Sequence, residues 1–268
     1  MLGKLLKYEL KAQGRILLPL YLLLLIVCAG LSFSVRQNDI LQGTNQPLIF
    51  LTIVLGFLFV GAILVTMIMT VVLILQRFYR NLLGNEGYMR FSLPVSTAEH
   101  ILSKGISALV FVVLSFVVGG ACALIMVSIL GDFPELWESF KTAWTGLFST
   151  YTRSTIIRYG ILSVALFLAG VLQQIGQVYA AISLGHQWSD HRLIGSFLAY
   201  LGLSILEGLL FSLMETGEKF TQQVTDGAFR ITITMEQGML ILLVAEIFFL
   251  LFYHFLTWWL LSHRLNLE

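Results

Sequence analysis

The chain has 268 residues, of which 57% are hydrophobic and 12% are charged, and its formal net charge is +1. A soluble domain carries roughly 25% charged residues, so this composition excludes an ordinary soluble globule of this size. Lipid contact over much of the surface explains the missing charge. The two cysteines, Cys28 and Cys122, lie inside apolar runs, which favours small core residues over a disulfide framework.

Residues 1–15 predict an amphipathic helix lying in the membrane interface. Basic side chains fall on one face of this helix and leucines fall on the other, as in helices that bind a membrane surface. The apolar run that follows is longer than the hydrophobic region of a secretory signal, so we expect a retained first helix. The basic face holds Lys4, Lys7, Lys11 and Arg15, and the apolar face holds Leu2, Leu5, Leu6 and Leu10.

Six apolar runs reach the length that crosses a bilayer, about 20 residues. Each must be helical, because no water is present in lipid to satisfy free backbone groups. The sequence therefore predicts an all-α polytopic membrane protein with one transmembrane domain over residues 1–268. The predicted spans cover residues 16–35, 48–75, 105–130, 158–184, 193–214 and 239–261.

Lys and Arg are unequally distributed between the two sides of these spans. Ten lie on one side and six on the other, and the richer side faces the cytoplasm. We therefore expect both termini in the cytoplasm and the chain in the cell (plasma) membrane. The ten are Lys4, Lys7, Lys11, Arg15, Arg77, Arg80, Arg90, Lys104, Arg192 and Arg264, and the six are Arg36, Lys141, Arg153, Arg158, Lys219 and Arg230. The outer side also holds Asp132, Glu135, Glu138, Glu215, Glu218, Asp226 and Glu236.

Two segments between the spans have a pattern of their own. Residues 76–104 form the longest cytoplasmic loop, in which Gly84, Gly87 and Pro94 separate short helical pieces. Residues 132–152 place apolar side chains at spacings of three and four, which predicts an outer interfacial helix with Trp at headgroup level. A plain connecting loop is the alternative. The apolar positions are Phe133, Leu136, Trp137, Phe140, Trp144, Leu147 and Phe148.

Polar groups interrupt three of the predicted spans. Glu207 and Glu246 lie in the outer halves of spans five and six, and Gln173 and Gln177 lie four residues apart in span four. One interpretation is that they line a translocation path, because charge at depth is costly and suggests function. The other is structural: the amides join helices, and each carboxyl is protonated or hydrogen-bonded near the headgroups.

No sequence motif indicates covalent chemistry. A P-loop, an H-E-x-x-H motif and a G-x-S-x-G motif are all absent. The histidines form no ligand cluster on one helix face, so we expect no metal site and no catalytic residue. The five histidines are His100, His186, His191, His254 and His263.

The loop sequence is the most informative part of the chain. It reads Phe78-Tyr79-Arg80-Asn81-Leu82-x-Gly84-x-Glu86-Gly87-Tyr88, followed by Leu93-Pro94-Val95-Ser96 and Ser103-Lys104. With the amphipathic start and the Ser183-Leu184-Gly185-His186 stretch, it resembles the permease subunits of type-2 ABC exporters of the Gram-positive bacterial type. Six spans with both termini inside agree with that family along the whole chain.

The resemblance implies that the loop between spans two and three is a coupling helix that docks on a separate ATP-binding subunit. Two permease chains, as a homodimer or heterodimer, and two ATPase chains would form the working unit. ATP and Mg would be bound by the ATPase subunit, with no cofactor and no nucleic acid bound by this chain. The implied docking residues are Arg80, Asn81, Gly84, Glu86, Gly87 and Tyr88.

The segment between spans five and six departs from the family pattern. Members often have a helical re-entrant pair there, whereas residues 215–238 are polar and include the β-like stretch 230–234. We therefore do not expect the usual outer gate. The implied function is ATP-driven export of an amphipathic or hydrophobic substrate, such as a peptide, an antibiotic or a lipid-like molecule. The alternatives are a proton-coupled secondary transporter, a non-transporting accessory membrane protein and an intramembrane enzyme.

Overall fold

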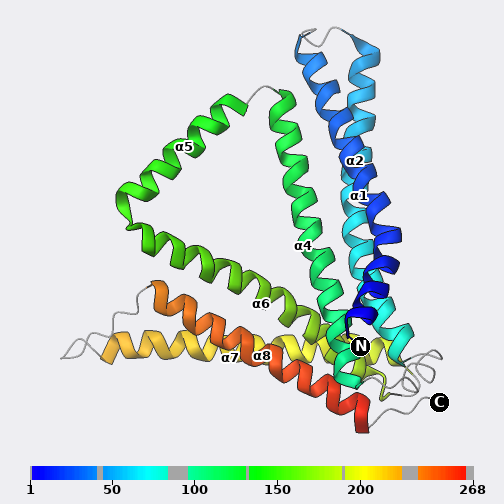
Figure 1. Ribbon diagram of the computed structural model, residues 1–268, viewed down its shortest axis with the longest axis vertical. Coiled ribbons are helices and arrows are strands. Elements are labelled where there is room, and N and C mark those ends of the chain that lie inside the picture. Colours follow the sequence, from blue (N-terminus) through cyan, green and yellow to red (C-terminus); the bar gives the residue numbers. More distant parts are fainter. Residues whose placement is uncertain are drawn as a thin grey trace. The chain divides into compact units, whose positions relative to one another are not determined.

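The computed structural model describes residues 2–40, 45–83, 96–130, 133–188, 191–224 and 235–263. Within these ranges the chain is all-helical and contains no strand, as the sequence predicts (Figure 1). The helices are α1 (Leu2–Ile40), α2 (Gln46–Phe78), the π-helical turn η1 (Tyr79–Leu83), α4 (Thr97–Leu130), α5 (Phe133–Thr150), α6 (Arg153–Gly185), α7 (Arg192–Val224) and α8 (Met235–His263).

In the described ranges, six helices are long and apolar enough to cross a membrane, and each contains one predicted span. The helices are longer than the apolar runs, because hydropathy marks only the part of a helix that suits lipid. The six are α1, α2, α4, α6, α7 and α8. The chain is thus a multi-pass helical membrane protein.

The N-terminal segment is not a separate helix. We expected a boundary near residue 15, but α1 runs without interruption from Leu2 to Ile40 and carries Pro19 inside it. The four basic side chains of residues 1–15 are exposed and the four leucines are half-buried, so the predicted amphipathic faces are correct. Because the residues around position 15 favour a helix, the amphipathic segment 1–15 and the first span form one continuous helix.

The end of span five also differs from the prediction. The predicted span ends at residue 214, but α7 continues through polar residues to Val224. Polar residues do not stop a helix that is already nucleated, since propagation needs only one further hydrogen bond per residue. The predicted β-like stretch 230–234 lies outside the described residues.

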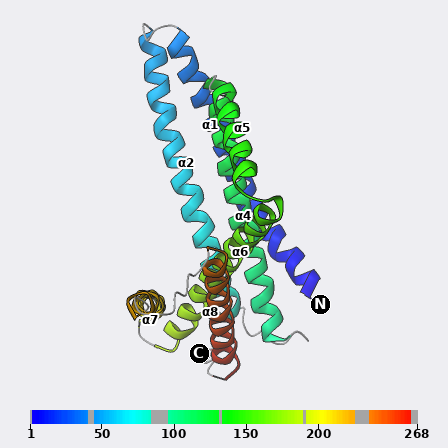
Figure 2. The ribbon, with the colours of Figure 1, turned by 90° about the vertical axis from the view of Figure 1, so that its left-hand side faces the viewer.

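The described chain divides into two compact units. The first comprises residues 1–74 and 106–157, and the second comprises residues 75–105 and 158–268. In the first unit, α1 and α2 form an antiparallel hairpin (Figures 1 and 2). Near its tip, Ser34 Oγ and Thr52 Oγ1 share a hydrogen bond of 2.6 Å, so the two helices are tied where they meet.

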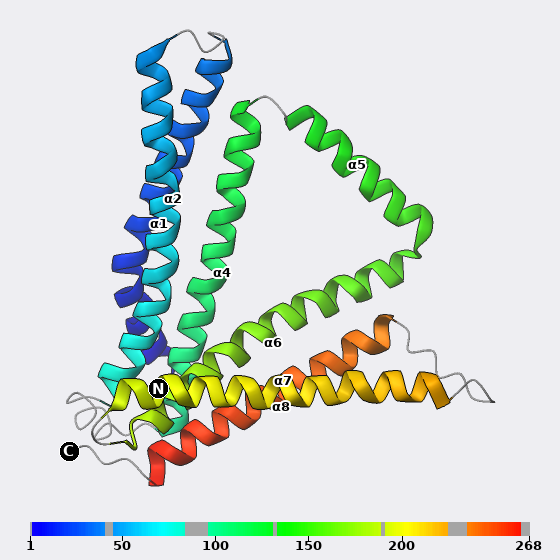
Figure 3. The same ribbon diagram turned by 180° about the vertical axis from the view of Figure 1, so that it is seen from behind.

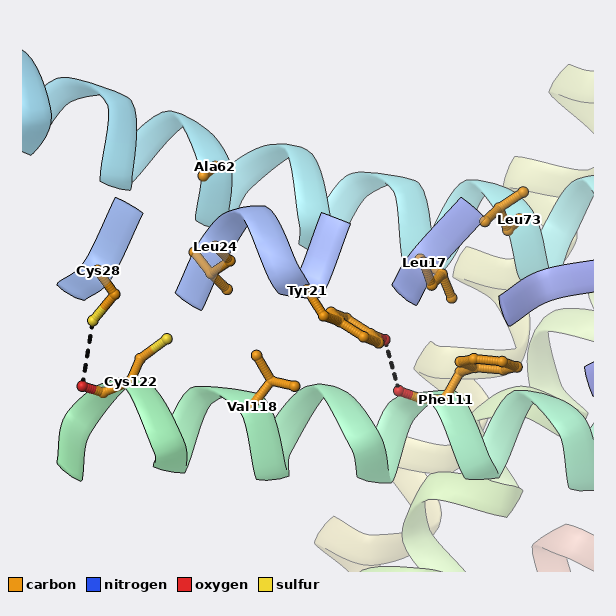
Figure 4. Close-up of a cluster of buried hydrophobic side chains, with 9 residues drawn as sticks. All are labelled: Leu17, Tyr21, Leu24, Cys28, Ala62, Leu73, Phe111, Val118 and Cys122. Atoms are coloured by element: carbon orange, nitrogen blue, oxygen red, sulfur yellow. Dashed lines mark hydrogen bonds between the residues drawn. The ribbon is translucent and has the colours of Figure 1, made fainter. Parts of the chain in front are cut away.

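The core of the first unit packs α1 between α2 and α4 (Figure 4). Hydrogen bonds join Gln13 to Ser107 and Tyr21 to Ser115, and the Cys28 thiol donates to the Cys122 carbonyl oxygen at 3.4 Å. All three pairs are separated by 94 positions, and a constant offset means that α1 and α4 are parallel. The buried cluster consists of Leu17, Tyr21, Leu24, Cys28, Ala62, Leu73, Phe111, Val118 and Cys122.

Helix α5 (Figure 3) is an amphipathic helix with no buried residue. Its rings form a continuous row in which Phe133, Trp137, Phe140, Trp144 and Phe148 are neighbours, with centroid separations of 6.4, 5.8, 5.8 and 5.1 Å. The sequence prediction of a helix with one apolar face is confirmed, and the alternative of a plain loop is wrong.

The second unit packs α6, α7 and α8 around a small apolar cluster of Ala180, Phe249 and Tyr253. Gly176 of α6 allows close approach, because a Cβ atom there would lie 3.4 Å from Tyr253 Cβ. Larger residues at this position would separate the helices. This packing brings the polar residues of three helices to one level.

Candidate functional site

The polar groups singled out on three separate spans meet in the second unit. Gln173 of α6 donates a hydrogen bond from Nε2 to Glu207 Oε1 of α7 at 2.8 Å. Tyr253 of α8 donates its hydroxyl hydrogen to Glu207 Oε2 at 3.0 Å. A donor from each neighbouring helix therefore holds the Glu207 carboxyl group, which cross-links all three helices. We call Gln173, Gln177, Glu207, Glu246 and Tyr253 the polar cluster.

A second interhelical bond lies one turn further along α6. Gln177 Nε2 donates to Ser204 Oγ of α7 at 3.1 Å. Gln173 and Gln177 are each 1% exposed, and their spacing of four residues places both on the helix face that meets α7. The contacts run in opposite sequence directions, which makes α6 and α7 antiparallel, as successive spans must be.

Glu246 approaches the polar cluster from α8. A Cβ atom on Gly170 of α6 would lie 3.9 Å from the Glu246 carboxyl carbon and from both of its oxygens, and Glu246 interacts electrostatically with Glu207. Glu246 follows the first residue of α8, Met235, by about 16 Å along the helix axis, or half of a ~30 Å hydrocarbon core. Because α8 begins at Met235 and not at the predicted residue 239, Glu246 lies about one turn further from the start of its helix than we expected.

Two buried acceptor atoms of the polar cluster have no hydrogen-bond partner among the described residues. They are Gln173 Oε1 and Glu246 Oε2. A buried acceptor without a donor costs about 1–3 kcal/mol. The amide of Gln173 and the hydroxyl of Tyr253 are both directed at Glu207. The polar cluster can therefore accept hydrogen bonds from a further group.

Tyr253 is the member of the polar cluster that sequence reasoning missed. An aromatic residue in an apolar span is usually counted as packing, and its hydroxyl carries no charge to attract attention. The signal available was its spacing, since Tyr253 follows Glu246 by two helical turns and so shares its face of α8. Buried tyrosines normally direct the hydroxyl to a partner.

The base of the 76–104 loop packs on the C-terminal end of α6. The rings of Phe78 and Tyr179 stack with centroids 4.0 Å apart, and Tyr79 meets His186 edge to face at 5.9 Å. Lys104 is 2% exposed, and its ammonium group donates to the Arg77 carbonyl oxygen at 3.1 Å. The two ends of the loop are thereby fastened to each other, and one is fastened to α6.

The structure places only two of the predicted docking residues. Arg80 is exposed on the π-helical turn, whereas the Asn81 side chain is 7% exposed and belongs to the packed base of the loop. Arg80 is thus accessible at the surface, whereas Asn81 is packed inside the turn. The remaining docking residues, Gly84, Glu86, Gly87 and Tyr88, lie outside the described residues.

Comparison with known proteins adds no relative. No family model, no curated protein and no solved structure matches the chain. Across the part of the chain that the structure describes, no group of three or more His, Cys, Asp or Glu side chains is placed to hold a metal ion.

Proposed function

We propose that this chain is the transmembrane permease subunit of an ATP-binding cassette exporter. A separate subunit would hydrolyse ATP, and this chain would move an amphipathic or hydrophobic substrate outward. It would pair with a second permease chain, since six spans supply half a pathway. Its termini and the 76–104 loop would face the cytoplasm of a cell whose plasma membrane holds the chain.

The observation that carries the proposal is the clamp between the loop base and α6. Phe78 stacks on Tyr179, which lies two residues beyond Gln177 on the same helix. A displacement of the loop would be passed to α6 and on to Glu207, which Gln173 holds at 2.8 Å. Such a linkage suits a loop that transmits the movement of a partner to a site within the membrane.

The mechanism follows from this linkage. ATP binding closes the partner dimer, and the loop moves with it as a lever. Spans two and five then rearrange at the permease dimer interface, so that access to the pathway changes from inside to outside. Work is transferred only if the loop binds the two ATPase states in different positions, because equal binding shifts no equilibrium.

Purification of the native complex in mild detergent tests the proposal. We expect a soluble subunit with Walker motifs to co-purify with this chain in equal amount. A chain that purifies alone, from cells that also express its neighbouring genes, would contradict the exporter assignment.

Variants of the loop tip test the docking residues. We expect Tyr88→Ala and Glu86→Gln to reduce substrate-stimulated ATPase activity several-fold at unchanged expression. Phe57→Ala is the matched control, since Phe57 is 76% exposed on α2 and remote from the loop. Intact stimulation in both loop variants would refute the assigned docking tip.

One observation favours a second candidate, a proton-coupled secondary transporter. Glu207 and Glu246 belong to one cluster within apolar helices, and paired carboxyl groups inside a membrane commonly carry protons. Proteoliposomes that contain this chain alone distinguish the two. Uptake driven by a pH gradient without ATP favours the secondary transporter, and transport that needs ATP and the second subunit favours the exporter.

A further inference from the structure

The N-terminal third of α1 carries an exposed row of cations. Lys4, Lys7, Lys11 and Arg15 are all exposed, and we call these four residues the basic stripe. At about 100° per residue, their positions fall within an arc of about 80° around the helix. None of the four forms an ion pair with another residue that the structure describes. The basic stripe is therefore a narrow band of four charges without a counter-charge on the described chain.

The packing of α1 against α4 fixes the direction in which the basic stripe points. Gln13 is 2% exposed, and its Nε2 donates to Ser107 Oγ of α4 at 3.3 Å. Gln13 lies about 160° around the helix from the centre of the stripe, so the stripe points away from α4. Glu9, the single acidic residue among the first 38, is 4% exposed and also lies on the packed side. The stripe thus faces the surroundings of the first unit.

The basic stripe continues directly into a helix that is apolar enough to cross a membrane. Helix α1 is unbroken from Leu2 to Ile40, so it is about 58 Å long, nearly twice a ~30 Å hydrocarbon core. The apolar run begins directly after Arg15, and Lys4 lies about 16 Å from Arg15 along the helix axis. In a bilayer that α1 spans, the stripe therefore starts at the level of the phosphate groups.

A row of cations at that level is suited to anionic lipid. Roughly four to eight Lys and Arg residues next to a span attract anionic headgroups. Tyr8 lies beside the stripe and is 71% exposed, and tyrosine favours the headgroup level. An acidic protein surface would match the charge alone, whereas a lipid headgroup matches both the charge and the position at the end of the span.

We propose that the basic stripe binds the headgroups of anionic phospholipids in the leaflet at the N-terminal end of α1. The ammonium and guanidinium groups donate charge-assisted hydrogen bonds to the phosphate oxygens. Lipids gathered there hold the N-terminal third of α1 at the membrane. This inference does not depend on the exporter assignment, because α1 and its packing on α4 carry it alone.

Energy transfer from α1 to labelled lipids tests the proposal. The donor dye is attached to Gly3→Cys in a Cys28→Ala and Cys122→Ala background, since Gly3 is exposed and nothing lies within 4 Å of its Cβ position. The purified chain is placed in phosphatidylcholine nanodiscs with a trace of acceptor lipid. The acceptor is phosphatidylglycerol or phosphatidylcholine with the same dye on the acyl chain. We expect at least twofold higher transfer to phosphatidylglycerol.

Salt and charge variants assign this preference to the stripe. In about 1 M NaCl, where the Debye length is only ~3 Å, we expect the two acceptors to give equal transfer. The combined variant Lys4→Gln, Lys7→Gln, Lys11→Gln and Arg15→Gln should also show no preference. The matched control, Lys4→Arg, Lys7→Arg and Lys11→Arg, keeps the charge and should retain the preference. A monodisperse gel-filtration profile identifies the variants that are folded.

Equal transfer to the two acceptors in the parent protein at low salt would overturn the proposal. A preference that persists in ~1 M NaCl, or in the folded glutamine variant, would overturn it as well. The salt measurement uses the parent protein, so it decides the matter even if the glutamine variant does not fold. Equal transfer together with salt-sensitive binding of a protein partner through the stripe would assign the stripe to that partner instead.

Discussion

Two glycines set how closely α6 and α7 approach at the turn that joins them. A Cβ atom on Gly185 would lie 2.1 Å from the backbone nitrogen of Ser196, and one on Gly195 would lie 2.6 Å from the Trp188 ring. The first contact is with backbone, which cannot move aside as a side chain can. Gly185 is thus required by the packing of this turn.

Replacement of Gly185 by alanine is expected to destabilise the chain. Overpacking of this kind costs about 1–3 kcal/mol, and a backbone contact places it at the upper end. Thermal unfolding in detergent should show a lower apparent Tm for Gly185→Ala. Gly202→Ala on α7 is the control, because nothing lies within 4 Å of its Cβ position; equal Tm values for the two variants would contradict the close approach.

Among the elements, the junction of α2 and η1 is a closely packed part of the loop base. Phe78, Leu82 and Leu83 are all nearly inaccessible to solvent, at 0%, 0% and 4% exposure. Their burial explains why a loop with polar sequence keeps helical structure as far as Leu83.

Phe78→Ala is expected to weaken this junction by about 3–5 kcal/mol, the usual cost of removing a buried aromatic ring. Limited proteolysis should then cleave near the loop faster than in the wild type. Phe57→Ala on the same helix should leave the cleavage rate unchanged, since Phe57 is exposed. A loop that remains equally protected in both variants would show that the stacking on Tyr179 is not what fastens it.

Helix α5 is suited to a membrane surface because its aromatic row is exposed and its other face is polar. Trp137 and Trp144 are 47% and 48% exposed, and Trp side chains prefer the headgroup level. Lys141 and Glu138 pair at 2.8 Å beside this row, with the Lys141 ammonium group 5.8 Å from the centroid of the Trp137 ring. In water, a helix with this exposed row of rings would associate with other apolar surfaces through the row.

Lipid contact of α5 is measurable by fluorescence quenching. In a variant that keeps only Trp137 and Trp144, lipids brominated near the headgroup should quench emission more strongly than lipids brominated at the chain ends. The Trp137→Phe and Trp144→Phe variant, with the other three Trp residues present, serves as the reference. Equal quenching by both lipids would place α5 away from the interface.

At the scale of the whole molecule, helix directions agree with successive membrane crossings inside each unit. The parallel pair α1 and α4 corresponds to two odd-numbered spans of the first unit. In the second unit, α6 and α8 meet at Gly170–Glu246 and Gly176–Tyr253, a nearly constant offset that makes this pair parallel as well. The distribution of Lys and Arg is the basis on which we predict which side is cytoplasmic.

Cysteine labelling checks this orientation. In a Cys28→Ala and Cys122→Ala background, whose native thiols are free and buried, Ser96→Cys is expected to react with a membrane-impermeant maleimide only in inverted vesicles. Thr142→Cys on α5 should react in intact cells. The reverse pattern would invert the orientation and place the loop outside the cell, which is incompatible with an ATPase partner in the cytoplasm.

The sequence by itself determined the helical class, the number of apolar helices and the amphipathic faces of residues 1–15 and α5. Hydropathy and helical periodicity are local properties, and a membrane allows few alternatives to a helix. Helix ends were less predictable, as the continuous α1 and the extended α7 illustrate.

Only the tertiary structure decided which polar groups meet. Gln173, Glu207 and Tyr253 lie on three different helices. The hydrogen bond from Gln173 to Glu207 joins residues 34 positions apart, and the one from Tyr253 to Glu207 joins residues 46 positions apart. Their meeting depends on the rotation and approach of α6, α7 and α8, which small residues such as Gly170 and Gly176 permit. Because packing couples residues that are distant in sequence, local patterns indicated the candidates but not their arrangement.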